Sequence, residues 1–126
     1  MTLEDAARLS AWSNGVGRIA VGIGLLASPK HAAGAWVGEA ESNRLSTALL
    51  GRAVGIRDVV IGAATVYGLT RGHARLALVG AALTDAGDLG ATLAAGDKLP
   101  EPGRTATLAL IATGITGAAF AATQLD

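Results

Sequence analysis

Residues 51–62 read Gly-Arg-Ala-Val-Gly-Ile-Arg-Asp-Val-Val-Ile-Gly, so three charges stand among apolar and small residues. At about 100° per residue, a helix through this region brings five residues onto one narrow stripe. These residues are Gly51, Gly55, Asp58, Gly62 and Thr65. The Asp58 carboxylate therefore projects from a groove of small residues, and Arg52 and Arg57 flank the groove on opposite sides.

Six charged residues interrupt stretches otherwise built from small and apolar residues: Arg18, Arg52, Arg57, Asp58, Asp85 and Asp88. A charge inside an apolar helix is costly unless it is paired, and three of these residues are basic and three acidic. If the helices are antiparallel neighbours, equal depths predict the pairs Arg18–Asp58, Arg57–Asp85 and Arg52–Asp88. We therefore expect a buried charge network or polar site, which acts as a structural lock or as a relay.

Four helical segments are predicted within a single domain covering residues 1–126: about 3–28, 44–69, 74–95 and 105–123. Thr2-Leu3-Glu4-Asp5 is typical of a helix N-terminus, and Ser28-Pro29 ends the first helix because proline disfavours helical geometry in the residue before it. The connection from Lys30 to Asn43 carries Trp36, which suits a loop or short helix at a membrane interface. Gly96 is expected to cap the third helix.

The composition favours a membrane. Apolar residues make up 51% of the 126 residues, and there are 18 glycines but only one phenylalanine. Folding in water would have little large surface to bury, whereas small residues let transmembrane helices approach closely. Only residues 105–125 form an uncharged run long enough to cross a bilayer, so the other spans require buried charges. The predicted fold is an all-α, up-down-up-down four-helix transmembrane bundle that is multi-pass in the cell membrane, with the lipid bilayer as its partner.

Five glycines are predicted to pack helices closely: Gly51, Gly55, Gly62, Gly80 and Gly87. Small residues at this spacing are typical of membrane helix interfaces. On the third helix, one stripe holds Ala81, Asp85, Asp88 and Thr92, and the neighbouring stripe holds Gly80, Thr84, Gly87 and Ala91. Glycine-rich surfaces also predict a homo-oligomer or a place in a larger membrane complex.

The sequence offers no catalytic constellation. The net charge is zero, which argues against nucleic acid as a partner, and cysteine is absent. His31 and His73 are expected in loops, and three or four good metal ligands do not converge, so no metal and no cofactor is assigned. No serine has a histidine at a credible depth to act as a base. Asp85 and Asp88 are three residues apart and are able to share a proton or help to bind a metal, or they belong to a dry salt-bridge network.

A resemblance to a known family rests on the same residues. Gly51-Arg52-Ala53-Val54-Gly55-Ile56-Arg57-Asp58, then Gly62 and later Asp85 and Asp88, is similar to the motif G-R-x-x-G-x-R-D-x-x-x-G with a following Asp pair. This motif belongs to a family of small four-helix integral membrane proteins classed as a domain of unknown function. Arg18 followed by Gly22, with Ser28-Pro29, resembles that family and, more distantly, the DoxX-like membrane proteins. The resemblance covers about residues 13–95 and implies a four-helix membrane fold with no known activity.

We expect a non-enzymatic role, as a structural or accessory membrane protein. The alternative is a small transporter, or a protein that handles protons or small ligands, using Asp58, Asp85 and Asp88. A second alternative is a soluble Ala-rich helical bundle. Basic residues nearly balance between the two ends, with Arg8, Arg71 and Arg75 at one end and Lys30, Arg44, Lys98 and Arg104 at the other. Because Arg71 and Arg75 bracket the shortest loop, both termini are predicted to be cytoplasmic.

Overall fold

The computed structural model describes residues 1–126, and its regular structure is entirely helical. Four long helices make up most of the chain: α1 (Leu3–Ala27), α4 (Leu45–Arg71), α5 (Arg75–Ala95) and α6 (Gly103–Gln124). Three short helices join them: α2 (Pro29–Val37), α3 (Glu39–Ser42) and the 3₁₀ helix η1 (Gly96–Lys98). The prediction of an all-α chain is confirmed.

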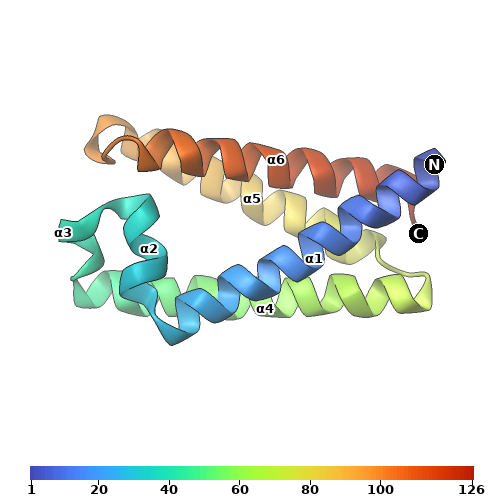
Figure 1. The fold of residues 1–126 in the computed structure, drawn as a ribbon, viewed down its shortest axis with the longest axis horizontal. Coiled ribbons are helices and arrows are strands. Elements are labelled where there is room, and N and C mark those ends of the chain that lie inside the picture. The colour runs from blue at the N-terminus through green and yellow to red at the C-terminus, as the bar shows by residue number, and fades with distance from the viewer.

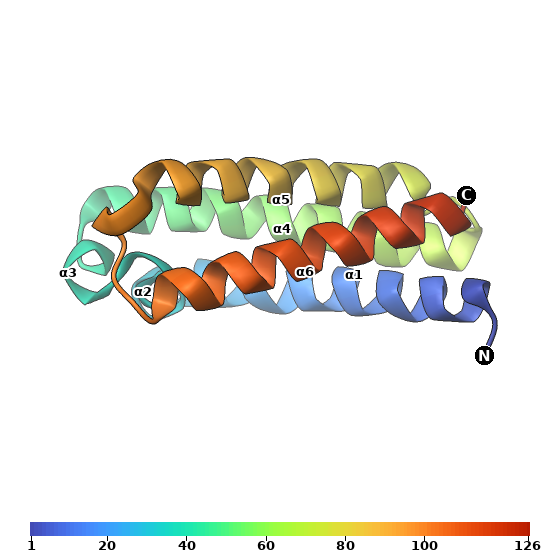
Figure 2. The same cartoon turned by 90° about the horizontal axis from the view of Figure 1, so that it is seen from above.

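The four long helices lie roughly along one axis and alternate in direction. Figure 1 shows α6 along the top and α4 along the bottom, α1 crossing the bundle obliquely, and both chain termini at the same end. Figure 2, turned by 90°, shows α2 and α3 at the opposite end. The closest packing joins α1 to α4 and α5 to α6, and α4 packs less closely against α5 than α1 does against α6. The bundle is therefore two tight helix pairs laid against each other.

The N-terminus of α1 is capped as predicted. Thr2 Oγ1 accepts a hydrogen bond from the Asp5 N–H at 3.1 Å, and Asp5 Oδ2 accepts one from the Thr2 N–H at 2.8 Å. This is a capping box, which satisfies two backbone donors that the first helical turn leaves free. The bond from the Thr2 backbone lowers the pKa of the exposed Asp5 carboxyl, because it favours the ionised form.

The turn between α4 and α5 is closed by glycine. Gly72 adopts φ +75°, which a residue with a Cβ rarely takes, and the N–H of His73 donates to Gly68 O at 2.9 Å. Helix α4 therefore continues to Arg71, two residues past the predicted end at 69, before the chain reverses. At the other end of α5, Gly96 caps the helix at φ +55°, as expected from the sequence.

The connection from 30 to 43 is mostly helical, as α2 and α3, and His31 lies in α2 rather than in a loop. Trp36 is half-buried, and its Nε1 donates to Thr92 Oγ1 of α5 at 3.1 Å. The indole is therefore held against the bundle by a residue distant in sequence. The residues around Trp36 do not predict this contact.

The interior of the bundle is made of small side chains. Only 25 of the 126 residues are buried, and the buried hydrophobic residues are mainly alanines. Many large aliphatic side chains are exposed instead, among them Leu9, Val16, Ile23, Leu49, Ile56, Val60, Leu76, Leu83, Leu93 and Leu110. Folded soluble proteins of this length normally place such side chains in the core.

Two helical segments are long and apolar enough to cross a membrane by length and composition, Arg75–Lys98 and Gly103–Gln124. Arg75–Lys98 qualifies beside the uncharged run at 105–125 although it contains Asp85 and Asp88, because its many apolar residues outweigh these two charges. Less than a quarter of the apolar window in either segment is buried, at 17% and 22%.

Candidate functional site

Arg18 of α1 is the centre of a charged network inside the bundle. Its Nη1 lies 3.0 Å from Asp58 Oδ1 of α4, and its Nη2 lies 2.5 Å from Asp85 Oδ1 of α5. Nη2 also donates to Ala81 O at 2.9 Å, and Nε donates to Asn14 Oδ1 at 3.2 Å. With a side chain only 8% exposed, Arg18 joins three helices through one guanidinium group.

Glycines bring α1 and α4 close enough for this contact. A Cβ built on Gly62 would lie 2.5 Å from Gly15 O, and one on Gly22 would lie 2.6 Å from Gly55 O. The two backbones therefore touch on both sides of Arg18, and no larger residue fits at these positions without a shift of the helices. This close approach places the Arg18 side chain beside Asp58.

Arg57 of α4 makes the second half of the network. Its Nη1 and Nη2 donate to the two carboxylate oxygens of Asp88 at 3.0 and 2.7 Å, which is the bidentate geometry that suits a guanidinium group. Nε and Nη2 also donate to Asp58 Oδ1 at 3.2 and 3.1 Å. Asp58 therefore links the two arginines, and the five charges form one connected cluster.

The network lies half-way along the helices. Asp58 is about 20 Å from either end of α4 and Asp85 about 15 Å from either end of α5, at 1.5 Å per residue. Every buried side-chain nitrogen and oxygen in the structure has a hydrogen-bond partner. Asp58 and Asp85, the two buried carboxylates of the network, thus lie far from both ends of their helices.

The predicted pairs are correct in part. Arg18 pairs with Asp58 as expected, and it also forms an ion pair with Asp85. Arg57 pairs with Asp88 and Asp58 and not with Asp85. Equal depth does not reveal how α5 is rotated about its own axis, and this rotation turns Asp85 toward α1 and α6.

Arg52 lies outside the network, and the expected pair with Asp88 does not form. The residue is exposed, and its Nε donates to Leu26 O near the end of α1 at 3.3 Å. The last carbonyl groups of a helix have no partner within the helix, so they accept such bonds readily. Arg52 thus fastens the end of α1 from the outside.

The predicted packing glycines fall into two groups. Gly51, Gly55 and Gly62 are buried on α4, and each faces α1 or Pro29 at the start of α2. Gly80 and Gly87 of α5 face away from the other helices, because a Cβ at either would meet no atom within 4 Å. Within this chain the packing expected of Gly80 and Gly87 is therefore absent.

Three polar residues that the sequence reasoning did not assign extend the network. Asn14 precedes Arg18 by four residues, which places both on one face of α1, and this spacing was a usable signal. Thr92 Oγ1 donates to Asp88 O at 2.7 Å and accepts from Trp36. The link from Trp36 to Thr92 had no signal in the sequence, since it joins α2 to α5.

The charges in the network do not cancel. Two guanidinium groups, Arg18 and Arg57, face three carboxylates, Asp58, Asp85 and Asp88, so the cluster carries one negative charge in excess when all are ionised. No group of three or more metal-binding side chains is arranged to hold a metal ion. The arrangement is suited chemically to holding helices together and to holding a proton.

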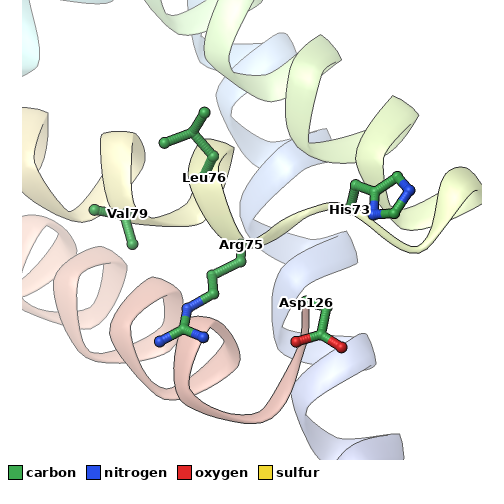
Figure 3. A pocket seen from close by; sticks show the side chains of 5 residues that line it. All are labelled: His73, Arg75, Leu76, Val79 and Asp126. Carbon is green, nitrogen blue, oxygen red and sulfur yellow. The ribbon is translucent and has the colours of Figure 1, made fainter.

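Two surface hollows lie at the end of the bundle that carries the termini. The one shown in Figure 3 has a volume of about 370 Å³, and it is lined by His73, Arg75, Leu76, Val79 and Asp126. The other has a volume of about 620 Å³, and it is lined by Ala64, Tyr67, Gly68, Arg71, His73, Leu76 and Ala77. Neither hollow includes a residue of the network.

No protein-family model, no curated protein and no solved structure matches this chain.

Proposed function

We propose that this chain is a small multi-pass membrane protein of structural or accessory type, in which the Arg/Asp network locks α1, α4 and α5 together at mid-membrane. The observation that carries the proposal is the inverted distribution of side chains. The buried residues are mainly alanine, glycine and a few polar residues, among them Arg18, Asp58 and Asp85, whereas most of the large aliphatic side chains are exposed. Lipid accommodates such a surface, and water does not.

The dimensions of the helices support a membrane position. Helices α5 and α6 have 21 and 22 residues, so they are about 32 Å long, close to the roughly 30 Å of a hydrocarbon core. Their apolar windows are largely exposed, unlike the core helix of a soluble protein, which passes the same hydropathy test while it is mostly buried. Helices α1 and α4 are longer, at 25 and 27 residues. Their charges Arg18, Arg57 and Asp58 face the other helices, whereas Arg52 is exposed.

A lock explains why charges are retained at this depth. Removing one partner of a buried ion pair leaves the other charge desolvated and typically costs about 3–5 kcal/mol. The network joins three helices, including the loosely packed pair α4 and α5, through Arg57 and Asp88. The resemblance to small four-helix membrane proteins supports the same architecture and brings no activity with it.

In this proposal the partners are the lipid bilayer and either a second copy of the chain or a larger membrane complex. Gly80 and Gly87 leave open space on α5, where a neighbouring chain would come close to the backbone. The cell membrane is the proposed location, with both termini on the cytoplasmic side.

A second candidate function, the handling of protons or small ligands, is favoured by the connection of polar groups along the bundle. Side chains are linked from Asn14 through Arg18, Asp58 and Arg57 to Asp88. The main chain of Asp88 then accepts from Thr92, which accepts from Trp36. A relay requires such continuity, and it also requires water at its ends.

Membrane residence is tested by fractionation of cells that express the chain. We expect the protein to sediment with membranes, to stay there through alkaline carbonate extraction and to need detergent for release. A soluble protein and an established integral membrane protein in the same lysate serve as markers. Recovery of a monodisperse species without detergent would overturn the proposal in favour of the soluble Ala-rich bundle.

A further inference from the structure

We propose that Asp85 is the proton-binding site of the network and carries its proton at neutral pH. The inference rests on the proposed membrane position and goes beyond it, because it names which carboxyl group is neutral. It starts from the surplus of one carboxylate over the guanidinium groups of the network. In a dry interior, an unpaired charge is neutralised by a proton more readily than it is kept.

The hydrogen bonds distinguish the three carboxylates. Asp58 Oδ1 accepts from three nitrogens of two arginines, at 3.0, 3.1 and 3.2 Å. Asp88 accepts from Arg57 through both oxygens. Asp85 contacts one guanidinium nitrogen, Nη2 of Arg18, through Oδ1 alone, and that nitrogen also serves Ala81 O. Asp85 therefore receives the least positive charge of the three.

The second oxygen of Asp85 faces α6 and accepts no hydrogen bond from either arginine. Oδ2 lies against Gly114 of α6, where a built Cβ would come within 2.5 Å of it. Helix α6 brings no charge to this contact, because its only charged residue, Arg104, bonds Glu101 near its start. Asp85 itself is about nine-tenths buried.

All charged groups that face Asp85 are thereby accounted for. They are Arg18 from α1, Asp58 and Arg57 from α4, and Asp88 from α5 itself. Arg52, the remaining arginine in the central part of α4, is exposed and bonds the end of α1. With a proton on Asp85 Oδ2, taken from the aqueous phase, two positive charges meet two negative charges and the network is neutral.

The direct test is infrared spectroscopy of the purified full-length protein in lipid nanodiscs at neutral pH. A protonated carboxyl group has a carbonyl band separate from that of a carboxylate, and this band shifts in D₂O. We expect the wild type to show the band and Asp85→Asn to lose it. Asp97→Asn, which changes an exposed aspartate in η1, is the matched control and should keep the band.

Thermal stability supplies an independent comparison. Asparagine imitates a neutral carboxyl group, so Asp85→Asn should unfold at or above the wild-type temperature. Asp58→Asn should unfold at a clearly lower temperature, because it removes the anion that two arginines share. A lower stability of Asp85→Asn than of Asp58→Asn would overturn the assignment.

The infrared spectrum of the wild type tests the proton site even if a variant fails to fold. Absence of the protonated band at neutral pH would mean that all three carboxylates are ionised, and persistence of the band in Asp85→Asn would place the proton elsewhere. Either result overturns the inference. Because carbonate extraction is a separate measurement, a protein that stays in membranes but lacks the band refutes the proton site alone, whereas release from membranes refutes the proposed function.

Discussion

At the scale of single residues, the surroundings of a charge determine its role. Arg18 and Arg52 are both arginines in apolar helices. Arg18 is 8% exposed and contacts two carboxylates, whereas Arg52 is exposed and bonds a backbone carbonyl. The difference follows from the direction in which each side chain leaves its helix, and it separates a residue of the lock from one that fastens a helix end.

A double-mutant cycle tests the observed pair Arg57–Asp88, which differs from the predicted pair Arg57–Asp85. Arg57→Ala and Asp88→Ala should each destabilise the detergent-solubilised protein, and the double variant should lose less than the sum of the two. We expect a coupling free energy of about 0.5–3 kcal/mol between them, since the two side chains share a bidentate contact. Chemical unfolding followed by circular dichroism measures it.

Arg52→Ala combined with Asp88→Ala is the control cycle, because Arg52 lies on the same helix and contacts no carboxylate. The effects of these two changes should add within about 0.5 kcal/mol. Strong coupling here, or strict additivity for Arg57 and Asp88, would contradict the observed pairing.

At the scale of the helices, the glycines on α4 and α5 have different roles although their spacing looks alike. On α4 they admit the backbone of α1, which lies within van der Waals distance of Gly55 and Gly62. On α5, Gly80 and Gly87 border open space. The helix pair α1 and α4 is therefore held by backbone proximity, and α5 is held by its other face.

The same substitution at two glycines tests this distinction. Gly62→Ala should destabilise the bundle by about 1–3 kcal/mol, because the new Cβ would press on Gly15 O. Gly87→Ala should be neutral or stabilise the chain by up to about 1 kcal/mol, because alanine is the better helix former and no atom is in its way. Thermal unfolding in detergent compares the two. A large loss at Gly87 together with a smaller oligomer would show that a second chain covers this face.

At the scale of the whole molecule, the alternating course of four long helices sets both termini at one end and the short helices α2 and α3 at the other (Figure 1). The network lies between these ends, and the aliphatic side chains surround it on the outside. In the proposed membrane position, the ends are the only parts of the chain that meet water.

Labelling of introduced cysteines tests this topology, and the chain contains no cysteine to interfere. Single variants Thr2→Cys and Gln124→Cys should react with a membrane-impermeant maleimide from the same side of sealed vesicles. Asp97→Cys, in η1 at the other end of α5, should react from the opposite side. Inverted vesicles supply the complementary measurement. Labelling of the two terminal positions from opposite sides would rule out four crossings.

Much of the architecture could be predicted from the sequence. Ser28-Pro29, Gly72 and Gly96 mark where helices end, and the backbone geometry at those residues is a local property. Residue spacing alone places five residues on one face of α4, and that face is buried in the structure. They are Gly51, Gly55, Asp58, Gly62 and Thr65. Trp36, by contrast, lies against Thr92, and no spacing connects these two positions.

The sequence by itself determined that the chain is helical, where the long helices lie within a few residues, and that Asp58 projects from a row of glycines. Only the tertiary structure decided that Asp88 and not Asp85 binds Nη1 and Nη2 of Arg57, and that Arg52 stays outside the network. The physical reason is that phase along one helix is set by about 100° per residue, whereas the rotation of that helix against its neighbours is set by contacts between distant segments.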